Sequence, residues 1–277
     1  MADAHSDSSS SPRTGGYGAS PGRFAPIDED GSLDGHRYLI IGGAGGIGSA
    51  LARRLAGRGA NLTLAGRSPE PLQELADELG AEAVTLNARD FDAVADVVSD
   101  LTKDGPLHGA ANCVGSIVLK PAHMISRDDF DEVLGQNLVS AFALVRAMGR
   151  HATRQEDGAS VVLVSTTAAR VGLPNHDVIA AAKAGVEGLA RSSAATYVEG
   201  GLRVNVVAPG LVDTPLAARI TGNDKALKAS EKMHPLGRIG QPDEIARVLE
   251  WLIAPEGSWV TGQVIGVDGG VSTVRKG

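Results

Sequence analysis

The chain has 277 residues, and its 26 basic and 33 acidic side chains give a formal net charge of −7. Residues 1–35 hold six of the acids and two of the bases, so the rest is nearly neutral, which argues against nucleic acid as a partner because phosphate binding requires a basic surface. The single cysteine, Cys113, excludes an internal disulfide and a cysteine-based zinc site. The sequence contains no run of about 18 apolar residues, the length that a membrane-spanning helix needs. We therefore expect neither a metal site nor a membrane partner.

Residues 1–35 are rich in Ser, Gly, Pro and Asp and show no apolar period, so we expect a disordered tail. The stretch also lacks the apolar segment of a secretory signal. It is interpreted as a solvated extension, with a regulatory or partner-binding tail as the alternative. The low cysteine content fits a reducing compartment and favours a cytoplasmic location.

From residue 36 to 277 we expect one domain in which strands and helices alternate. The expected strands are continuous apolar runs at 37–41, 61–65, 82–86, 107–114, 159–165, 202–208 and 263–267. Helical apolar spacing is found for Ile47, Leu51 and Leu55 and over 71–79, 92–101, 128–150, 176–199 and 243–253. Apolar strands alternating with helices are typical of a parallel sheet covered on both faces. The sequence therefore predicts an α/β protein, a doubly wound Rossmann-type fold with a parallel seven-stranded sheet.

A glycine-rich turn, residues 42–48, joins the first strand to a helix. A pyrophosphate requires free backbone N–H groups at a helix N-terminus and a close approach that side chains would obstruct. An ordinary tight turn is the alternative, but the order strand, turn, helix favours a dinucleotide site. The candidate cofactor residues in this turn are Gly42, Gly45, Gly46, Ile47 and Gly48.

The end of the second strand indicates which dinucleotide is bound. NAD-selective folds place an acidic residue near this point, and here Arg67 and Ser68 stand instead. Their charge and hydroxyl suit a 2′-phosphate, which favours NADP (NADPH) and makes NAD the less favoured cofactor; a solvated loop arginine is the alternative. Asn87, after the third strand, could accept from the adenine amino group or be a plain turn residue.

Over residues 36–272 the chain resembles the short-chain dehydrogenase/reductase family. The glycine turn is similar to the family's cofactor motif, with Ile41 where Thr is usual, and further motifs follow in the family's order. These are Asn112-Cys113-Val114-Gly115, Asn137 within Gln136-Asn137-Leu138, Arg203-Val204-Asn205, Pro209-Gly210 followed by Thr214, and Val267-Asp268-Gly269-Gly270.

The resemblance implies roles for several of these residues. Asn137 matches the asparagine of the family's proton relay. Cofactor contacts are implied for Asn112, Gly115, Pro209, Gly210, Val212 and Thr214, and for Lys183, which would hold the nicotinamide ribose. A small-molecule substrate and a homodimer or homotetramer are implied as well.

The catalytic core of the family is a Ser, a Tyr thirteen residues later and a Lys four residues after that. Lys183 is present, but Ile179 stands at the Tyr position and Thr166 at the Ser position. A Thr hydroxyl can still donate to a substrate oxygen, whereas an Ile side chain cannot transfer a proton. Among the three tyrosines, Tyr197 lies closest in sequence beyond Lys183, about 21 Å farther along one helix. The proton must therefore come from another group.

His176 is the leading substitute, because it lies three residues before Ile179 and an imidazole suits acid–base work near neutral pH. Alternatively, it belongs to a polar helix start that Asn175 or Asp177 caps. Lys183 could itself donate if burial lowers its pKa. His123 and His234 are expected to be surface or loop histidines.

Three functions remain open from the sequence. We expect an NADP(H)-dependent oxidoreductase that transfers hydride between nicotinamide and a carbonyl or alcohol substrate with a modified proton relay, in which Asn137, Thr166, Lys183 and His176 are the catalytic candidates. The first alternative is a catalytically silent NADP(H)-binding sensor or structural subunit, which the substitution by Ile179 supports. The second is a reaction such as double-bond reduction or isomerisation.

Overall fold

A computed structural model describes residues 31–152 and 158–275 and confirms the predicted sheet. The sheet has seven parallel strands in the order β3-β2-β1-β4-β5-β6-β7. Ile41 of β1 pairs with Ala65 of β2 and with Asn112 of β4, so the carboxyl ends of these strands meet at one edge. The strands are β1 Arg37–Ile41, β2 Asn61–Gly66, β3 Glu82–Thr85, β4 Gly109–Asn112, β5 Ala159–Val164, β6 Leu202–Pro209 and β7 Val264–Val267.

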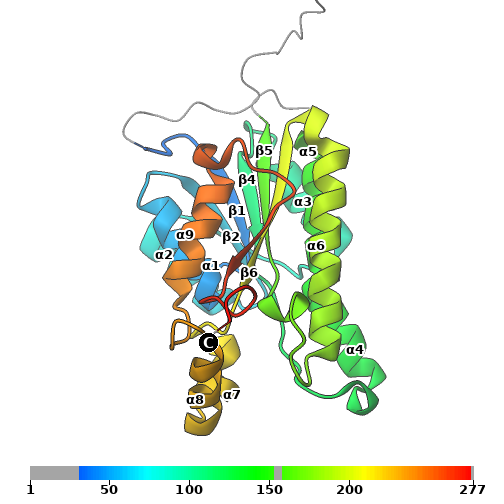
Figure 1. Ribbon diagram of the computed structural model, residues 1–277. Helices are drawn as coiled ribbons and strands as arrows, with labels where there is room; N and C mark the ends of the chain where they lie inside the picture. The colour runs from blue at the N-terminus through cyan, green and yellow to red at the C-terminus, as the bar shows by residue number, and fades with distance from the viewer. Residues whose placement is uncertain (1–30, 153–157, 276–277) are drawn as a thin grey trace, which may run out of the picture.

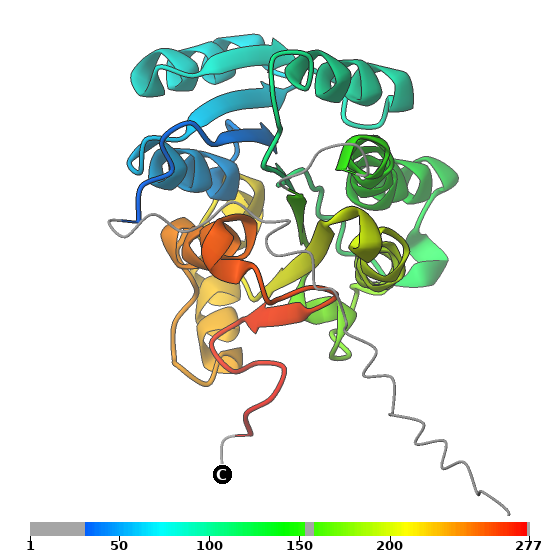
Figure 2. The ribbon, with the colours of Figure 1, turned by 90° about the horizontal axis from the view of Figure 1, so that it is seen from above.

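Helices cover both faces of the sheet, as the two views show (Figure 1, Figure 2). One face carries α1 Gly46–Ala56, α2 Pro69–Leu79 and α9 Pro242–Ile253; the other carries α3 Phe91–Leu101, α5 Ser140–Ala152 and α6 Asp177–Tyr197. Each face has its own apolar core, because strand side chains alternate between the two sides. Short 3₁₀ turns lie at Ala122–Met124, Thr167–Ala169, Val198–Gly200, Pro215–Ala217 and Pro255–Gly257.

The ordered packing begins before residue 36. Leu33 lies in the stretch that was expected to be a disordered tail, yet its side chain is 1 % exposed in the core beside α1 and α9. Its N–H donates to the carbonyl of Arg58 at 2.7 Å. A lone Leu among polar residues has no apolar period, so sequence patterning could not include it. The expectation for residues 1–30 lies outside the described residues.

The helix predicted over 128–150 is interrupted. The structure has α4 Arg127–Leu134, a π-helical segment Gly135–Val139 and then α5. Within that segment the Nδ2 of Asn137 donates to the carbonyl of Val133 at 2.9 Å. Single-turn π-helices often occur at functional sites. The apolar spacing continues through the segment, so periodicity alone could not reveal it.

Two further helices, α7 Ala218–Thr221 and α8 Asp224–Met233, were not predicted. Only Ser230 of α8 is buried, so this polar segment carries little apolar signal. Both helices project beyond the sheet opposite α4 and the start of α6 (Figure 1). Over residues 31–152 and 158–275 no helix combines the length and apolarity needed to cross a bilayer.

Candidate active site

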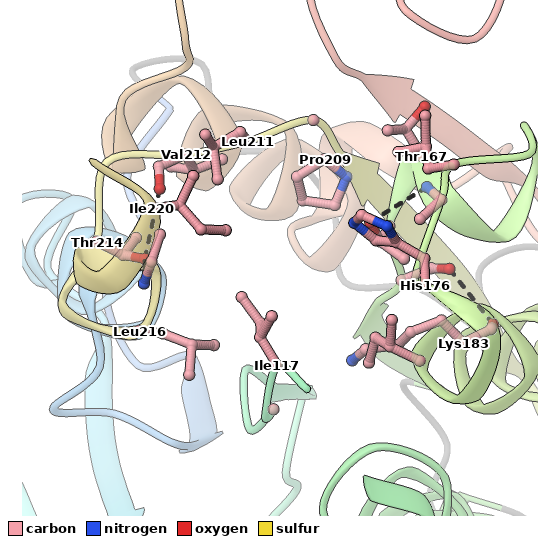
Figure 3. A pocket seen from close by; sticks show the side chains of 18 of the residues that line it. Ile117, Thr167, His176, Lys183, Pro209, Leu211, Val212, Thr214, Leu216 and Ile220 are labelled. Atoms are coloured by element: carbon pink, nitrogen blue, oxygen red, sulfur yellow. Dashed lines mark hydrogen bonds between the residues drawn. The ribbon is translucent and has the colours of Figure 1, made fainter. Parts of the chain in front are cut away.

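A cavity of about 450 Å³ opens at the carboxyl edge of the sheet. Such an edge is where open α/β sheets bind ligands. The loop after β4, the end of β5 and the start of α6 form one side of the cavity, and α7 and α8 form the other. His176 and Lys183 lie opposite Thr214, Leu216 and Ile220 across it (Figure 3).

The glycine turn has a geometry that would let a ligand's phosphates approach the protein backbone closely. Gly42 has φ +83°, and a Cβ there would lie 2.9 Å from the carbonyl carbon of Cys113. A Cβ on Gly48 would collide with the carbonyl oxygen of Gly42. The N-terminus of α1 follows at Gly46 with no side-chain cap and no acidic residue in its first turn. Its N–H groups and positive helix end therefore suit a pyrophosphate.

Arg67, Ser68 and Asn87 lie at the same edge of the sheet, since they follow β2 and β3. All three are exposed, and none lines the 450 Å³ cavity. Over the described part of the chain, the side chains of Arg67 and Ser68 make no hydrogen bond or ion pair, so both can contact a ligand. Asn87 Oδ1 accepts from the N–H of Arg89 at 3.2 Å, which leaves its Nδ2 free to donate.

Asn112 acts through the protein instead of facing the cavity. Its Nδ2 donates to Ser140 Oγ at 3.0 Å, and its Oδ1 accepts from the N–H of Val114 at 2.9 Å. This buried side chain therefore uses both its amide nitrogen and its amide oxygen for hydrogen bonds within the protein. Asn112 thereby fixes the loop in which Gly115 lines the cavity.

Asn137 lines the cavity from the π-helical segment. Besides Val133, its Nδ2 contacts Ser116 Oγ at 3.1 Å, and its Oδ1 lies 3.4 Å from the N–H of Ser116. A Cβ on Gly115 would approach Asn137 Oδ1 to 3.2 Å and Lys183 Nζ to 3.8 Å. The tertiary structure thus brings Gly115, Asn137 and Lys183 together, as the sequence motifs implied.

Three consecutive hydroxyl residues follow β5, and two of them are engaged elsewhere. Ser165 Oγ donates to Glu187 Oε1 at 3.0 Å and lies 3.3 Å from the carbonyl of Lys183. Thr167 Oγ1 donates to Asp268 Oδ2 at 3.0 Å. Thr166 Oγ1 only accepts, from the N–H of Ala168 at 3.3 Å. The proton of Thr166 is therefore the one available to a ligand.

Lys183 is a buried cation on the cavity wall. Its Nζ donates to the carbonyl of Val164 at 2.7 Å, and its side chain is nearly inaccessible. Burial disfavours the charged form and lowers the pKa of Lys183 to about 8. Burial likewise raises the pKa of Cys113 to about 12, so the thiol is neutral. Lys183 can thus release or hold a proton near neutral pH.

Ile179 faces the cavity from the first turn of α6 and packs with Val133, Val178 and Ala182. His176 also lines the cavity, but it precedes the helix as its N-cap residue and makes no side-chain cap bond. Its Nδ1 lies 2.7 Å from the carbonyl of Pro174 and must carry the proton, because a carbonyl only accepts. The Nε2 of His176 is then the nitrogen available to a ligand.

The segment after β6 closes over the glycine turn. Pro209 ends β6, Val212 is buried, and Thr214 packs so tightly on the turn that a Cβ on Gly46 would lie 2.8 Å from Thr214 Cγ2. All three residues line the cavity with Gly210. The segment after β6 therefore connects the glycine turn, residues 42–48, to the cavity whose wall includes Thr166 and Lys183.

His234 lies in the loop directly after α8, which agrees with one part of the expectation, but its side chain is buried and not at the surface. Its Nδ1 donates to the carbonyl of Ser230 at 2.7 Å, and its Nε2 accepts from the N–H of Leu211 at 3.2 Å. These two bonds join the end of α8 to the segment after β6. A histidine in a polar stretch gives no sequence sign of such burial.

We expect His234→Ala to lower the free energy of unfolding by about 1–3 kcal/mol, because it leaves the N–H of Leu211 without its partner and removes the side-chain bond to the carbonyl of Ser230. Urea unfolding measures the change. His123→Ala is the matched control, since His123 is exposed, and should change stability by less than about 0.5 kcal/mol. Equal effects of the two substitutions would contradict the assigned role of His234.

The chain is similar to known proteins over most of its length. A family model described as Enoyl-(Acyl carrier protein) reductase matches residues 42–272. The 3-oxoacyl-(acyl-carrier-protein) reductase FabG of Thermotoga maritima is 34 % identical in an alignment covering 86 % of this chain and 98 % of that protein. The hydroxynaphthalene reductase-like protein Arp2 of Metarhizium brunneum is 35 % identical over 87 % of this chain and 97 % of that protein.

A solved short-chain type dehydrogenase/reductase from Mycobacterium ulcerans superposes with a TM-score of 0.83 at 28 % identity, covering 87 % of this chain and 91 % of that one. The chain belongs to the short-chain dehydrogenase/reductase family. This is a family of oxidoreductases that bind nicotinamide cofactors and act on small molecules. The uncapped helix, the glycine cradle and the adjoining cavity fit such a cofactor.

Several cavity residues were missed by sequence reasoning. Ser116 and Ile117 directly follow Gly115, and the general rule that ligands bind beyond the carboxyl ends of strands could have identified them. Leu216 and Ile220 carry no such signal, because they approach the cavity only when α7 folds over the sheet edge.

Proposed function

We propose that this short-chain dehydrogenase/reductase is an NADPH-dependent carbonyl reductase with a modified proton relay, which also catalyses the reverse oxidation of an alcohol. The observation that carries the proposal is that Thr166, His176 and Lys183 line one cavity at the end of the glycine cradle. Each retains an atom suited to a reacting carbonyl. A protein that only sensed the cofactor would not require this arrangement.

When NADPH is bound, it would supply the hydride that reduces the carbonyl carbon of the substrate. The Thr166 hydroxyl donates to the substrate oxygen and stabilises the charge that develops there. Protonated His176 gives the Nε2 proton to the alkoxide, while its Nδ1–H stays bonded to Pro174. Lys183 would hold the nicotinamide ribose, and it adds positive charge at the same end of the cavity.

Hydride transfer is tested by following NADPH oxidation with a panel of ketones across pH. We expect His176→Ala to lower kcat for reduction about 100-fold, because a positioned general acid contributes at least that factor. His123→Ala, at an exposed position, should leave kcat unchanged. An unchanged rate and pH profile in His176→Ala would assign the proton to Lys183 instead. Tight NADPH binding without turnover on any ketone or enone would favour the silent cofactor-binding alternative.

Arg67 and Ser68 support the preference for NADPH over NADH. We expect Arg67→Glu to weaken NADPH binding about 10–100-fold with little effect on NADH, because a charge-assisted hydrogen bond to the 2′-phosphate contributes about 1.5–3 kcal/mol. Fluorescence titration of both cofactors measures this. Arg127→Glu is the control, because Arg127 is exposed on α4 and pairs with Asp131. Parallel losses for both cofactors would refute the assignment of Arg67.

Reduction of a double bond conjugated to a carbonyl is a second candidate, favoured by the apolar Ile179 where a hydroxyl donor would stand. In that reaction a proton reaches carbon instead of the carbonyl oxygen. Product analysis with an enone separates the two: carbonyl reduction yields an allylic alcohol, and double-bond reduction yields a saturated ketone.

We also propose a homodimer or homotetramer and a cytoplasmic location. The assembly is supported by membership of a family in which oligomers are common and by exposed apolar side chains such as Phe142 on α5 and Trp259 before β7. The single cysteine supports the location. Light scattering of the purified protein measures the assembly.

A further inference from the structure

The ionisable side chains of the 450 Å³ cavity restrict what it can hold. Over the described residues that line it, there is no Asp, Glu or Arg. Lys183 is at the wall assigned to the cofactor, and its Nζ already donates to Val164. Burying a carboxylate, phosphate or ammonium without an opposite charge costs several kcal/mol. Away from the end that holds Lys183 and His176, a charged substrate group would therefore have no counter-ion.

The polar side chains on the far side are also engaged. Ser230 Oγ donates to the carbonyl of Ala226 at 2.9 Å, and both ring nitrogens of His234 are bonded. Thr214 Oγ1 caps the turn at Ala217. The groups that remain for a ligand are the hydroxyls of Ser116 and Thr166 and the Nε2 of His176, which lie on the side formed by the loop after β4, the end of β5 and the start of α6. The cavity thus offers hydrogen bonds at one end only.

The opposite wall is apolar. Leu216 and Ile220 project toward the cavity from the segment that carries α7 (Figure 3). Further apolar lining comes from Ile117, Leu119, Leu173 and Met233. Substrate hydroxyls facing this wall would lose their water without gaining a partner, which disfavours polyols and sugars.

We propose that the substrate is an uncharged, mainly apolar ketone or enone with its carbonyl at one end and a hydrocarbon body against Leu216 and Ile220. The proposal rests on the carbonyl reductase function above and names its substrate class. The carbonyl oxygen faces Thr166 and His176, and the remainder contacts only apolar side chains. Neither a second polar group nor a charge on the body finds a partner.

Matched ketones test the substrate class. With 2-butanone, 2-hexanone and 2-octanone, kcat/KM should rise about fourfold for each methylene added, because each buries apolar area. The length-matched 7-oxooctanoate and 8-amino-2-octanone should fall at least 100-fold below 2-octanone. Charged compounds that react within about threefold of 2-octanone would overturn the proposal.

A charge introduced into the apolar wall gives a second test. Leu216→Arg should raise the ratio of kcat/KM for 7-oxooctanoate to that for 2-octanone about tenfold or more, because the guanidinium supplies the missing counter-ion. Leu216 is half-exposed, so an Arg can be accommodated. Leu236→Arg is the control, since Leu236 is more exposed and does not line this cavity, and should leave the ratio unchanged. An unchanged ratio in Leu216→Arg would overturn the placement of the substrate body.

Ligand-induced thermal stabilisation of the NADPH complex separates this inference from the proposed function. Stabilisation by 2-octanone but not by 7-oxooctanoate, without turnover of any ketone, would reject hydride transfer and support the apolar ligand class. Turnover confined to charged ketones would support hydride transfer and reject the ligand class.

Discussion

Restoring the family's catalytic pair, Thr166→Ser with Ile179→Tyr, should raise kcat for ketone reduction about 100-fold. A tyrosine hydroxyl at position 179 adds a general acid one helical turn before Lys183, whose positive charge favours the phenolate left after proton transfer. Ile179 borders the 450 Å³ cavity, so the larger ring has room to extend into it. Steady-state reduction of 2-octanone at saturating NADPH measures the change.

The matched control for this gain is Thr166→Ser with Ile179→Phe. It introduces a ring of similar size without the hydroxyl. Equal rates in the Tyr and Phe proteins would show that a proton donor at 179 does not limit the reaction. A loss in both, with unchanged NADPH affinity, would show that the cavity needs Ile179 for its shape.

Lys183→Met should lower kcat/KM for reduction at least 1,000-fold and weaken NADPH binding as well. The substitution removes both the positive charge at the reacting end of the cavity and the donor proposed for the ribose. The same kinetic assay and a fluorescence titration measure the two effects. Lys103→Met, at an exposed position in the turn after α3, should change neither. Loss of activity with unchanged NADPH affinity would show that Lys183 acts in the reaction and does not contribute to NADPH binding.

Lys183→Met also has a signature in the pH dependence of stability. Because the folded pKa of Lys183 is about 8 and its ordinary value is 10.5, the unfolded chain binds more protons between these values. The lysine therefore makes stability rise with pH through that range. Cys113 and Tyr38 oppose the rise, since their pKa values are raised by burial. Because the charge of Lys183 also lowers the pKa of Cys113, the lysine and the methionine proteins are compared in a Cys113→Ala background. Urea unfolding at pH 7.5 and pH 10 should show a shallower rise in Lys183→Met.

Local patterns were enough to predict the sheet and the glycine turn between the first strand and its helix. Continuous apolar runs separated by helical periods identify buried parallel strands, and a glycine turn between strand and helix identifies a dinucleotide site. These features depend on residues close together in the chain. The helix break at Asn137 and the polar α8 could not be predicted, because the apolar spacing continues through the break and α8 buries only Ser230.

The roles of individual polar residues depended on the tertiary structure. Among Ser165, Thr166 and Thr167, sequence spacing indicates the middle residue, and the structure supplies the reason: the outer two donate to Glu187 and Asp268. Neither carboxylate is near them in sequence. For the same reason, His234 changed from a candidate surface residue to a buried tie between two segments.

The sequence by itself determined the fold, the family and the absence of a tyrosine at position 179, because periodicity, motif order and residue identity are local properties. Only the tertiary structure decided which groups face the reacting end of the cavity and which are already bonded. Hydrogen-bond partners and burial come from segments far apart in the chain, and these set the proton available on Thr166 and the lowered pKa of Lys183. The apolar wall at Leu216 and Ile220 likewise exists only when α7 folds over the sheet edge.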